Sequence, residues 1–200
     1  MQVRSCSIDG AWEFTPIVRP DDRGVFLESF RADVLTEVVG HAFDLRQMNI
    51  SVSRAGTVRG IHFADIPPGQ AKYVQCFQGT ILDVVVDIRL GSPTFGRWDA
   101  VELSEERRNA LYIAEGLGHA FCALSEQVTV GYLCSAEYAP AREHGIHPCD
   151  PELALPWPTT ITPVLSPKDA AAPTLAEAMA TGLLPTMADC SAWERSLRPS

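Results

Sequence analysis

Hydrophobic and polar positions alternate in short runs along the middle of the chain, and Gly, Pro and Ser interrupt these runs. Between residues 47 and 133 the β-rich runs are TVRGIHF, AKYVQCF, TILDVVVDIRL, ALYIAE, HAFCAL and VTVGYLC. Many short strands with turn signals between them are typical of an all-β sandwich or barrel. The stretch QCFQGTILDV further predicts a β-hairpin that turns at Gln78 and Gly79.

The run TILDVVVDI shows the strand alternation most clearly. Its even-numbered residues from 82 to 88 are all apolar, whereas the odd-numbered ones are Asp83, Val85 and Asp87. Because successive side chains of a strand point to opposite faces, one face is wholly apolar and the other is mixed. We expect the apolar face to pack against a second layer and the mixed face to line a more hydrated opening of the barrel.

Helical periodicity occurs at two places outside the strand-rich region. The early run DVLTEVVGH predicts a helix that stops at Gly40, and TLAEAMATGLLP predicts a late one. Thr174 and Glu177 form a capping box at the start of the late helix. We therefore expect a single domain over residues 1–200: a β barrel with an open interior, followed by a helical tail over residues 170–200.

Composition and charge narrow the class of protein. The chain has 200 residues, 46% of them hydrophobic, with a formal net charge of -9, which indicates a folded globular protein without a basic nucleic-acid surface. No apolar run is long enough to span a bilayer, and the N-terminus has no apolar signal core. The six cysteines form no C-x-x-C pair, which favours reduced thiols. We expect a cytoplasmic protein with no nucleic-acid and no membrane partner.

The stretch TVRGIHFADIPPG places one histidine, His62, on a predicted strand. A metal site needs several convergent ligands, but His62 has no histidine two positions later, and His119 alone adds only a second ligand. We therefore expect no metal. A neutral imidazole suits proton abstraction if a carboxylate orients it. Asp83, Asp87 and Asp169 are all candidates for that carboxylate, and a buried core histidine is the structural alternative.

Cations near the same strand are candidate ligands for an anion. Arg59 lies three positions before His62, so strict alternation would put the two side chains on opposite faces. A bulge at Gly60 would turn both inward. Arg23 and Lys72 lie beside other apolar runs. Arginine binds phosphate with two hydrogen bonds, and lysine suits a single developing oxyanion, although each cation taken alone fits a solvated surface charge equally well.

Several stretches, taken in order, carry a family resemblance. They are DDRGVFLESF, QMNISVSRAGTVRGIHF, AKYVQCFQGTILDVVVDIRLGSPTFGRW, YIAEGLGHAF, EYAP, DPELALPWP and LSPKDA. From about Phe14 to Asp169 the chain resembles the dTDP-4-dehydro-6-deoxyhexose 3,5-epimerases, also called dTDP-4-dehydrorhamnose 3,5-epimerases. The resemblance implies a cupin-type jelly-roll barrel with a few short peripheral helices and a C-terminal helix. It also implies a homodimer that shares strands, a dTDP-linked keto sugar as substrate, and neither cofactor nor metal.

The resemblance assigns four catalytic roles. His62 matches the base that takes the proton beside the carbon 4 ketone, and Asp169 matches the carboxylate that holds this histidine. Lys72 matches the cation that stabilises the enolate oxygen. Tyr138, in EYAP, matches the acid that returns a proton to the opposite face of the sugar ring.

The resemblance also assigns substrate-binding residues. The diphosphate is expected at two arginines, and the nucleotide and sugar at further side chains, some of them supplied by a partner subunit; the set is Arg23, Arg59, Phe26, Glu28, Gln47, Asn49 and His119. Asp83 is expected to contact the residues that line this pocket rather than the substrate.

Some stretches depart from the rhamnose-pathway pattern. Those enzymes usually read RGLHYQ, where this chain reads RGIHFAD, and PPGQAKYV is more similar to the 3-epimerases of antibiotic deoxysugar pathways. We therefore expect inversion at carbon 3 of the sugar, with carbon 5 as the second candidate centre. Two alternatives stay open: a sugar-nucleotide-binding cupin without catalysis, and a metal-dependent cupin enzyme.

Overall fold

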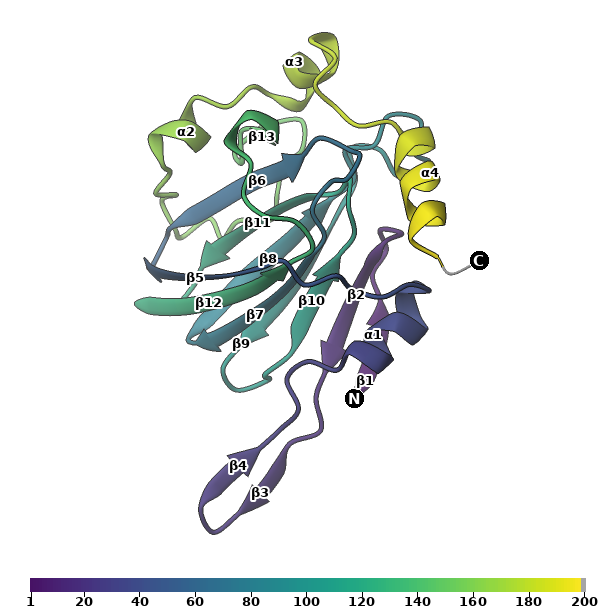
Figure 1. Cartoon of the computed structure of the whole chain (residues 1–200). Coiled ribbons are helices and arrows are strands. Elements are labelled where there is room, and N and C mark those ends of the chain that lie inside the picture. The colour runs from purple at the N-terminus through teal and green to yellow at the C-terminus, as the bar shows by residue number, and fades with distance from the viewer. Residues whose placement is uncertain (199–200) are drawn as a thin grey trace.

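The computed structural model describes residues 1–198 and consists mainly of two antiparallel sheets (Figure 1). The larger sheet has the strand order β1 (Gln2–Ser5), β2 (Ala11–Thr15), β10 (Ala110–Ile113), β7 (Lys72–Gln78), β12 (Gln127–Cys134) and β5 (Gln47–Arg54). The smaller sheet has the order β13 (Glu143–Gly145), β6 (Val58–Ala64), β11 (Gly118–Ala123), β8 (Thr80–Val86) and β9 (Trp98–Ser104). The prediction of an all-β, cupin-type jelly-roll barrel is confirmed.

The main core lies between the two sheets. Val74 and Leu111 of the larger sheet pack in one cluster with Ile81, Val85 and Phe121 of the smaller one. The strand alternation predicted for β8 explains this, because its odd-numbered face points into the barrel.

The apolar face of β8 packs on the other side of the smaller sheet. Val84 and Val86 belong to a second buried cluster, together with Ile146, Leu153 and Leu175. The second layer that the sequence predicted is therefore formed by the C-terminal third of the chain, which covers the outside of this sheet. The mixed face points inward, where Asp83 is completely buried.

The predicted hairpin at Gln78 and Gly79 is wrong. β7 pairs with β10 and β12, whereas β8 pairs with β9 and β11, so the chain changes sheets at this turn. Gly79 has a φ of +73°, and a Cβ there would lie 2.6 Å from the carbonyl oxygen of Gln127. A tight glycine turn between two strand patterns does not reveal whether the two strands pair.

The helices are short and peripheral. They are α1 (Ala32–Val39), the 3-10 helix η1 (Pro140–Arg142), α2 (Pro167–Ala170), α3 (Leu175–Ala180) and α4 (Met187–Leu197). Gly40 ends α1 in the left-handed conformation, and the capping box of Thr174 and Glu177 starts α3, as predicted. The predicted tail over 170–200 contains α3 and α4, and its residues 199–200 lie outside the described residues. No helix within residues 1–198 is long and apolar enough to cross a membrane.

A two-stranded hairpin extends away from the barrel. It consists of β3 (Arg19–Asp21) and β4 (Gly24–Phe26) and protrudes from the end near the N-terminus (Figure 1). All six of its strand residues are exposed, and 65% of the Phe26 surface is accessible. An exposed aromatic side chain on a protruding arm is a feature that the barrel itself does not explain.

Candidate active site

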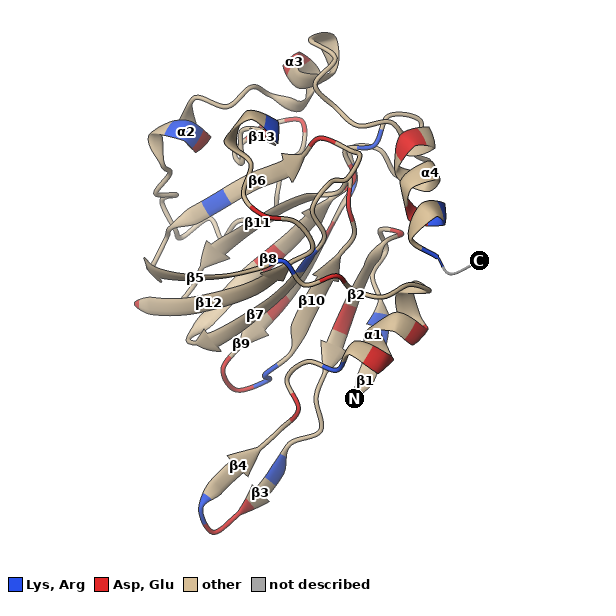
Figure 2. Ribbon diagram, in the orientation of Figure 1, with Lys and Arg blue, Asp and Glu red and all other residues tan. Residues whose placement is uncertain are grey.

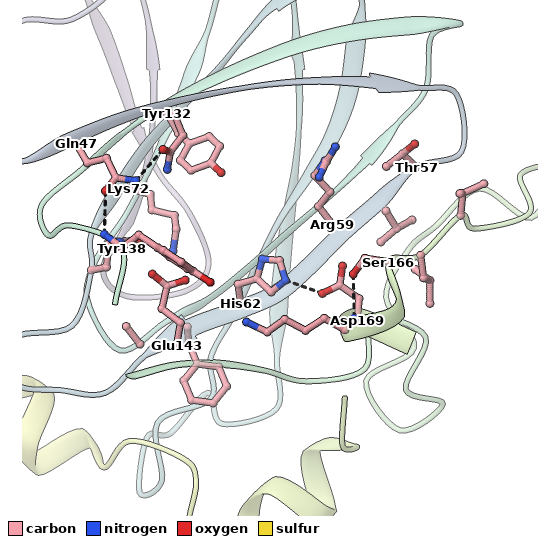
Figure 3. A pocket seen from close by; sticks show the side chains of 18 residues that line it. Gln47, Thr57, Arg59, His62, Lys72, Tyr132, Tyr138, Glu143, Ser166 and Asp169 are labelled. Carbon is pink, nitrogen blue, oxygen red and sulfur yellow. Dashed lines mark hydrogen bonds and ion pairs between the residues drawn. The ribbon is translucent and has the colours of Figure 1, made fainter. Parts of the chain in front are cut away.

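A cavity of about 450 Å³ opens at the end of the barrel where β5, β6, β7, β12, β13 and α2 meet (Figure 3). Seven of the twelve predicted site residues line it: Gln47, Asn49, Arg59, His62, Lys72, Tyr138 and Asp169. Residues from strands far apart in the sequence therefore converge on one space. The geometry of each contact shows what chemistry the space allows.

His62 and Asp169 form a hydrogen-bonded pair at the cavity wall. The Nε2 atom of His62 lies 2.6 Å from Oδ1 of Asp169. Asp169 lies on α2, where the Ser166 Oγ caps the helix by accepting a 3.0 Å hydrogen bond from the Asp169 backbone N–H. Because a carboxylate only accepts, Nε2 carries the imidazole proton, and Nδ1 is left with a free lone pair. Nδ1 of His62 can therefore act as a base toward a group bound in the cavity.

The charge of Asp169 is stabilised by its neighbours. Burial alone would raise the pKa of this carboxyl group, but hydrogen bonds from His62 and Ser166 and from the Gly60 backbone outweigh burial and lower it. The carboxyl group is therefore ionised throughout the neutral range. An ionised partner both orients the imidazole and stabilises the imidazolium that forms when His62 takes a proton.

A β-bulge at Gly60 brings Arg59 and His62 to the same face. His62 pairs with His119 and Arg59 pairs with Phe121, so three steps along β6 match two steps along β11. Gly60 has a φ of +122°, and a Cβ there would lie 2.5 Å from the His119 carbonyl oxygen. The bulge predicted from the sequence is confirmed, and both side chains line the cavity.

Lys72 is a buried cation at the first position of β7. Its side chain lines the cavity, although the residue is only 8% exposed. Burial lowers the pKa of its ammonium group, while Cys134 and the carboxylates of Glu143 and Asp83 act in the opposite direction. An ammonium group in such a dry environment interacts strongly with any negative charge that develops nearby.

Tyr138 reaches the cavity from the loop that follows β12. Its backbone N–H donates a 2.8 Å hydrogen bond to Oε1 of Gln47, and Nε2 of Gln47 donates a 2.7 Å bond to Oδ1 of Asn49. Figure 3 shows the Tyr138 side chain extending toward His62, with Lys72 beside it. A phenol and an imidazole therefore approach one space from different elements.

His119 and Asp83 lie behind the cavity wall. The Nε2 atom of His119 is 2.7 Å from Oδ1 of Asp83, and both residues are buried. Burial raises the pKa of Asp83, against the opposing effects of His119 and Lys72. His119 sits opposite His62 in the ladder but does not line the cavity. Both side chains therefore lie behind the cavity lining, and the roles expected for them stay predictions.

Three predicted residues lie away from the cavity of their own chain. Arg23 is at the tip of the β3–β4 hairpin, where it pairs with Asp21 at 2.5 Å while its side chain is 90% exposed. Phe26 and Glu28 are also exposed, on β4 and just after it. The hairpin extends outward, so the structure does not bring these three residues to the seven that line the cavity.

Other lining residues were not predicted. They include Thr57, Gln70, Tyr132, Glu143, Ser166 and Lys168. The Ser-Pro-Lys-Asp stretch that starts α2 is a helix N-cap signal, so Ser166 could have been recognised beside Asp169. Glu143 lies on a three-residue strand paired with β6, which is too short to show any alternation. Within residues 1–198, no group of three or more His, Cys, Asp or Glu side chains is arranged to hold a metal ion.

Basic residues are spread over the molecule, and a few of them lie at the cavity. Figure 2 shows Lys and Arg scattered over the β3–β4 hairpin, β6, α2 and α4 rather than gathered in one stripe. Of these, Arg59 on β6 and Lys168 on α2 line the cavity. The cavity thus combines a base, a buried ammonium group, a phenol and two further cations.

Comparisons with known proteins place this geometry in a family. A family model described as dTDP-4-dehydrorhamnose 3,5-epimerase matches residues 5–177. A Mycolicibacterium smegmatis protein named dTDP-4-dehydrorhamnose 3,5-epimerase is 57% identical over 198 residues, which cover 99% of this chain and 98% of the relative.

Two solved structures support the resemblance to epimerases of antibiotic pathways. NovW, a 4-keto-6-deoxy sugar epimerase from the novobiocin biosynthetic gene cluster of Streptomyces spheroides, is 55% identical, with a TM-score of 0.93 and 95% of both chains covered. ChmJ, a 3'-monoepimerase from Streptomyces bikiniensis solved with dTDP-quinovose, is 49% identical, with a TM-score of 0.94 and 96% and 97% of the two chains covered. The resemblance inferred from the sequence motifs is therefore confirmed, and the chain belongs to the dTDP-4-dehydrorhamnose 3,5-epimerase family.

Proposed function

We propose that this protein epimerises a dTDP-linked 4-keto-6-deoxyhexose at carbon 3 in deoxysugar biosynthesis. The observation that carries the proposal is the convergence of the His62–Asp169 pair, Lys72 and Tyr138 on one cavity. Inversion needs one group that removes a proton and another that returns one to the opposite face, and a cavity with a single acid–base residue would not supply both.

The proposed reaction passes through an enolate. Nδ1 of His62 takes the proton from carbon 3, and the electron pair of the broken C–H bond moves into the carbon 4 carbonyl. The ammonium group of Lys72 stabilises the enolate oxygen, and the Tyr138 hydroxyl then protonates carbon 3 from the other face. His62 releases its proton to water, and the Tyr138 phenolate takes one back. A positioned base typically contributes ~10²–10⁴ in rate, and an oxyanion donor about 10²–10³.

The cations of the cavity suit the negatively charged diphosphate of the substrate, which stays attached to the sugar throughout the reaction. Arg59 donates from Nε to Oγ of Ser53 at 3.1 Å, which leaves its two terminal nitrogens for other acceptors. Lys168 lines the same cavity from α2. Since arginine binds phosphate oxygens in pairs, we assign the diphosphate to this side, and the sugar to the His62 side. The relative ChmJ was solved with dTDP-quinovose, in which a diphosphate likewise joins the sugar to the nucleoside.

A homodimer would complete the site. The exposed face of the edge strand β5 is apolar at Met48, Ile50 and Val52, which are 53%, 64% and 58% exposed. An exposed apolar edge strand is normally covered. A second copy seated there would let the protruding hairpin deliver Arg23 and Phe26 to the partner's cavity. We therefore include the homodimer in the proposal.

We also propose that the enzyme works in the cytoplasm. All six cysteines lie within the described residues and are free thiols, four of them buried. Unpaired cysteines in this number favour a reducing compartment.

The proposal is tested by incubating the dTDP-4-keto-6-deoxy sugar with the protein in D₂O and locating deuterium by NMR. We expect deuterium at carbon 3 and an inverted configuration there, and the same spectra show whether carbon 5 is also inverted. Binding without deuterium incorporation would contradict catalysis and favour a sugar-nucleotide-binding protein. Incorporation that stops after dialysis against a chelator and returns with a divalent metal would favour the metal-dependent alternative.

A further inference from the structure

Glu115 is a half-buried acid that the proposed reaction does not use. It follows β10, the strand that pairs with β7 on the side opposite β12. Lys72 pairs with Ile113 of β10 and with Cys134 of β12. Glu115 and the loop after Cys134 therefore approach the start of β7 from its two sides.

Ser135 joins these two sides. Its hydroxyl donates a 3.0 Å hydrogen bond to Oε1 of Glu115, and the Ser135 Oγ in turn accepts a 2.8 Å bond from the backbone N–H of Ala71. The backbone N–H of Ser135 in turn donates to the Ala71 carbonyl oxygen at 3.0 Å. Ala71 and Ser135 thus extend the β7–β12 ladder by one residue pair, in which the Ser135 hydroxyl replaces a backbone acceptor. Glu115 holds that hydroxyl in place.

The loop before β7 leaves room for Glu115. A Cβ at Gly69 would lie 2.7 Å from Cβ and 2.9 Å from Cγ of Glu115, and Gly69 has a φ of +70°. Only glycine satisfies both the space and the backbone conformation. Burial raises the pKa of the Glu115 carboxyl group, against its hydrogen bonds to backbone and to Ser135. A carboxyl group that is partly removed from water is unfavourable without hydrogen bonds, so the Ser135 hydroxyl stabilises Glu115, and Glu115 fixes the orientation of that hydroxyl.

The segment that Ser135 anchors carries Tyr138. Within the described chain, the Tyr138 hydroxyl has no hydrogen-bond partner, and the residue is 57% exposed. The position of its ring therefore depends on the backbone of residues 135–138. Besides Ser135, that backbone is held by Gln70 Nε2, which donates to the Ala136 carbonyl oxygen at 3.0 Å, and by Gln47 at Tyr138 itself.

We propose that Glu115 is a positioning residue that, through Ser135, fixes the Tyr138 loop for protonation of the enolate. The inference rests on the proposed function. Lys72 is less sensitive to this contact, because backbone ladders hold it on both sides. Loss of the Glu115–Ser135 bond therefore misplaces the acid while the base and the cation stay in place.

A misplaced acid has a specific kinetic signature. His62 still removes the carbon 3 proton, and the imidazolium exchanges its proton with solvent. If Tyr138 does not protonate the far face, the imidazolium returns a solvent deuteron to the near face. The sugar then gains deuterium without inversion. A variant that is merely unstable loses exchange and inversion together.

The experiment compares Glu115→Ala and Ser135→Ala with the wild-type chain in D₂O, by NMR of both sugar epimers. We expect the ratio of exchange without inversion to inversion to rise about tenfold or more in both variants, since small misplacements have large kinetic effects. Glu115→Gln keeps an oxygen that accepts from Ser135, so its ratio should stay within about twofold of wild type. Thr174→Ala removes the cap of α3, away from the cavity, and serves as a stability control whose ratio should not change.

An unchanged ratio in Ser135→Ala would overturn the inference, and so would a rise in Glu115→Gln as large as in Glu115→Ala. Ser135→Ala decides the matter if Glu115→Ala does not fold, because it removes only one hydroxyl. Absence of carbon 3 exchange in the wild-type chain would instead contradict the proposed function itself.

Discussion

At the scale of single residues, the chemistry depends on how His62 is held. Asp169 accepts from Nε2 and is itself held on α2 by Ser166, so the imidazole has one defined tautomer. The sequence contains three candidate carboxylates for this role, and spacing could not distinguish them. The distance of 107 residues between the partners shows why: only the folding of α2 onto β6 brings them together.

The tautomer predicts the effect of Asp169→Asn. The amide can donate to Nε2 and so leave the proton on Nδ1, where it blocks proton abstraction. We expect the rate of carbon 3 exchange to fall by about 10³–10⁴, as in other histidine–aspartate pairs, with little change in KM. Steady-state kinetics measure both quantities. Retention of more than a tenth of the wild-type rate would show that the carboxylate does not set the tautomer.

At the scale of elements, a bulge in one strand positions the site, and a cluster of hydrogen bonds fixes a loop next to another strand. The bulge in β6 turns Arg59 and His62 to one face, and the loop after β8 is fixed by Asp87. That carboxylate accepts from Arg89 at 2.8 and 2.9 Å and from the hydroxyls of Ser92 and Thr94 at 2.6 Å each. Each feature depends on one residue, Gly60 within β6 and Asp87 directly after β8.

The bulge predicts that Gly60→Ala is disruptive. The new methyl group would overlap the His119 carbonyl oxygen and Ala120, and the φ of +122° is unfavourable for alanine. We expect a loss of about 2–4 kcal/mol in the free energy of unfolding, measured by urea denaturation. Gly91→Ala is the matched control, since that glycine also has a positive φ but meets nothing within 4 Å. Equal losses in both variants would mean that backbone conformation alone, and not the bulge, explains the effect.

The Asp87 contacts predict an acid-dependent stability. Burial would raise the pKa of Asp87, but hydrogen bonds from Arg89, Ser92 and Thr94 lower it below its ordinary value of 3.8. Below about pH 3.8 the unfolded chain therefore binds a proton that the folded chain does not, and stability falls as the pH drops through the folded-state pKa. Asp169 contributes with the same sign.

Asp87→Asn should therefore lose about 3–5 kcal/mol at pH 7 and show a weaker decrease in stability between pH 4 and pH 2. Urea denaturation at several pH values measures both effects. A variant whose stability falls with acid as steeply as that of wild type would exclude Asp87 as a source of the dependence.

Element type was predictable from sequence, but sheet partners were not. The capping box at Thr174, the stop at Gly40 and the Gly60 bulge are local features, encoded within a few residues. The turn at Gly79 has the local sequence of a hairpin turn, yet it joins strands of two different sheets. Which strands pair is decided by strands distant in the sequence. Glu143 was not recognised because its strand of three residues is too short to show a pattern of alternation.

At the scale of the whole molecule, the β3–β4 hairpin and the outer face of β5 leave apolar surface exposed. Family motifs suggested Arg23, Phe26 and Glu28 for the site, yet these residues lie outside their own cavity. Sequence motifs identify these residues as site candidates, but the pattern of a single chain does not encode which surface would meet a second copy. The homodimer and the single-domain organisation stay predictions.

We expect sedimentation equilibrium at micromolar concentration to give twice the chain mass of 21.8 kDa. Ile50→Glu places a charge on the exposed face of β5 and should yield a monomer with strongly reduced turnover. Glu102→Lys, on an exposed position of β9, is a control that should stay dimeric. A wild-type monomer with full activity would contradict the shared site.

The central claim is that His62 removes the carbon 3 proton. The most direct measurement is the rate of solvent deuterium incorporation at carbon 3 in His62→Ala, compared with wild type and with His144→Ala. His144 is a neighbouring imidazole on β13 that does not line the cavity. We predict a loss of ~10²–10⁴ in His62→Ala and a near wild-type rate in His144→Ala. Incorporation by His62→Ala at the wild-type rate would contradict the account.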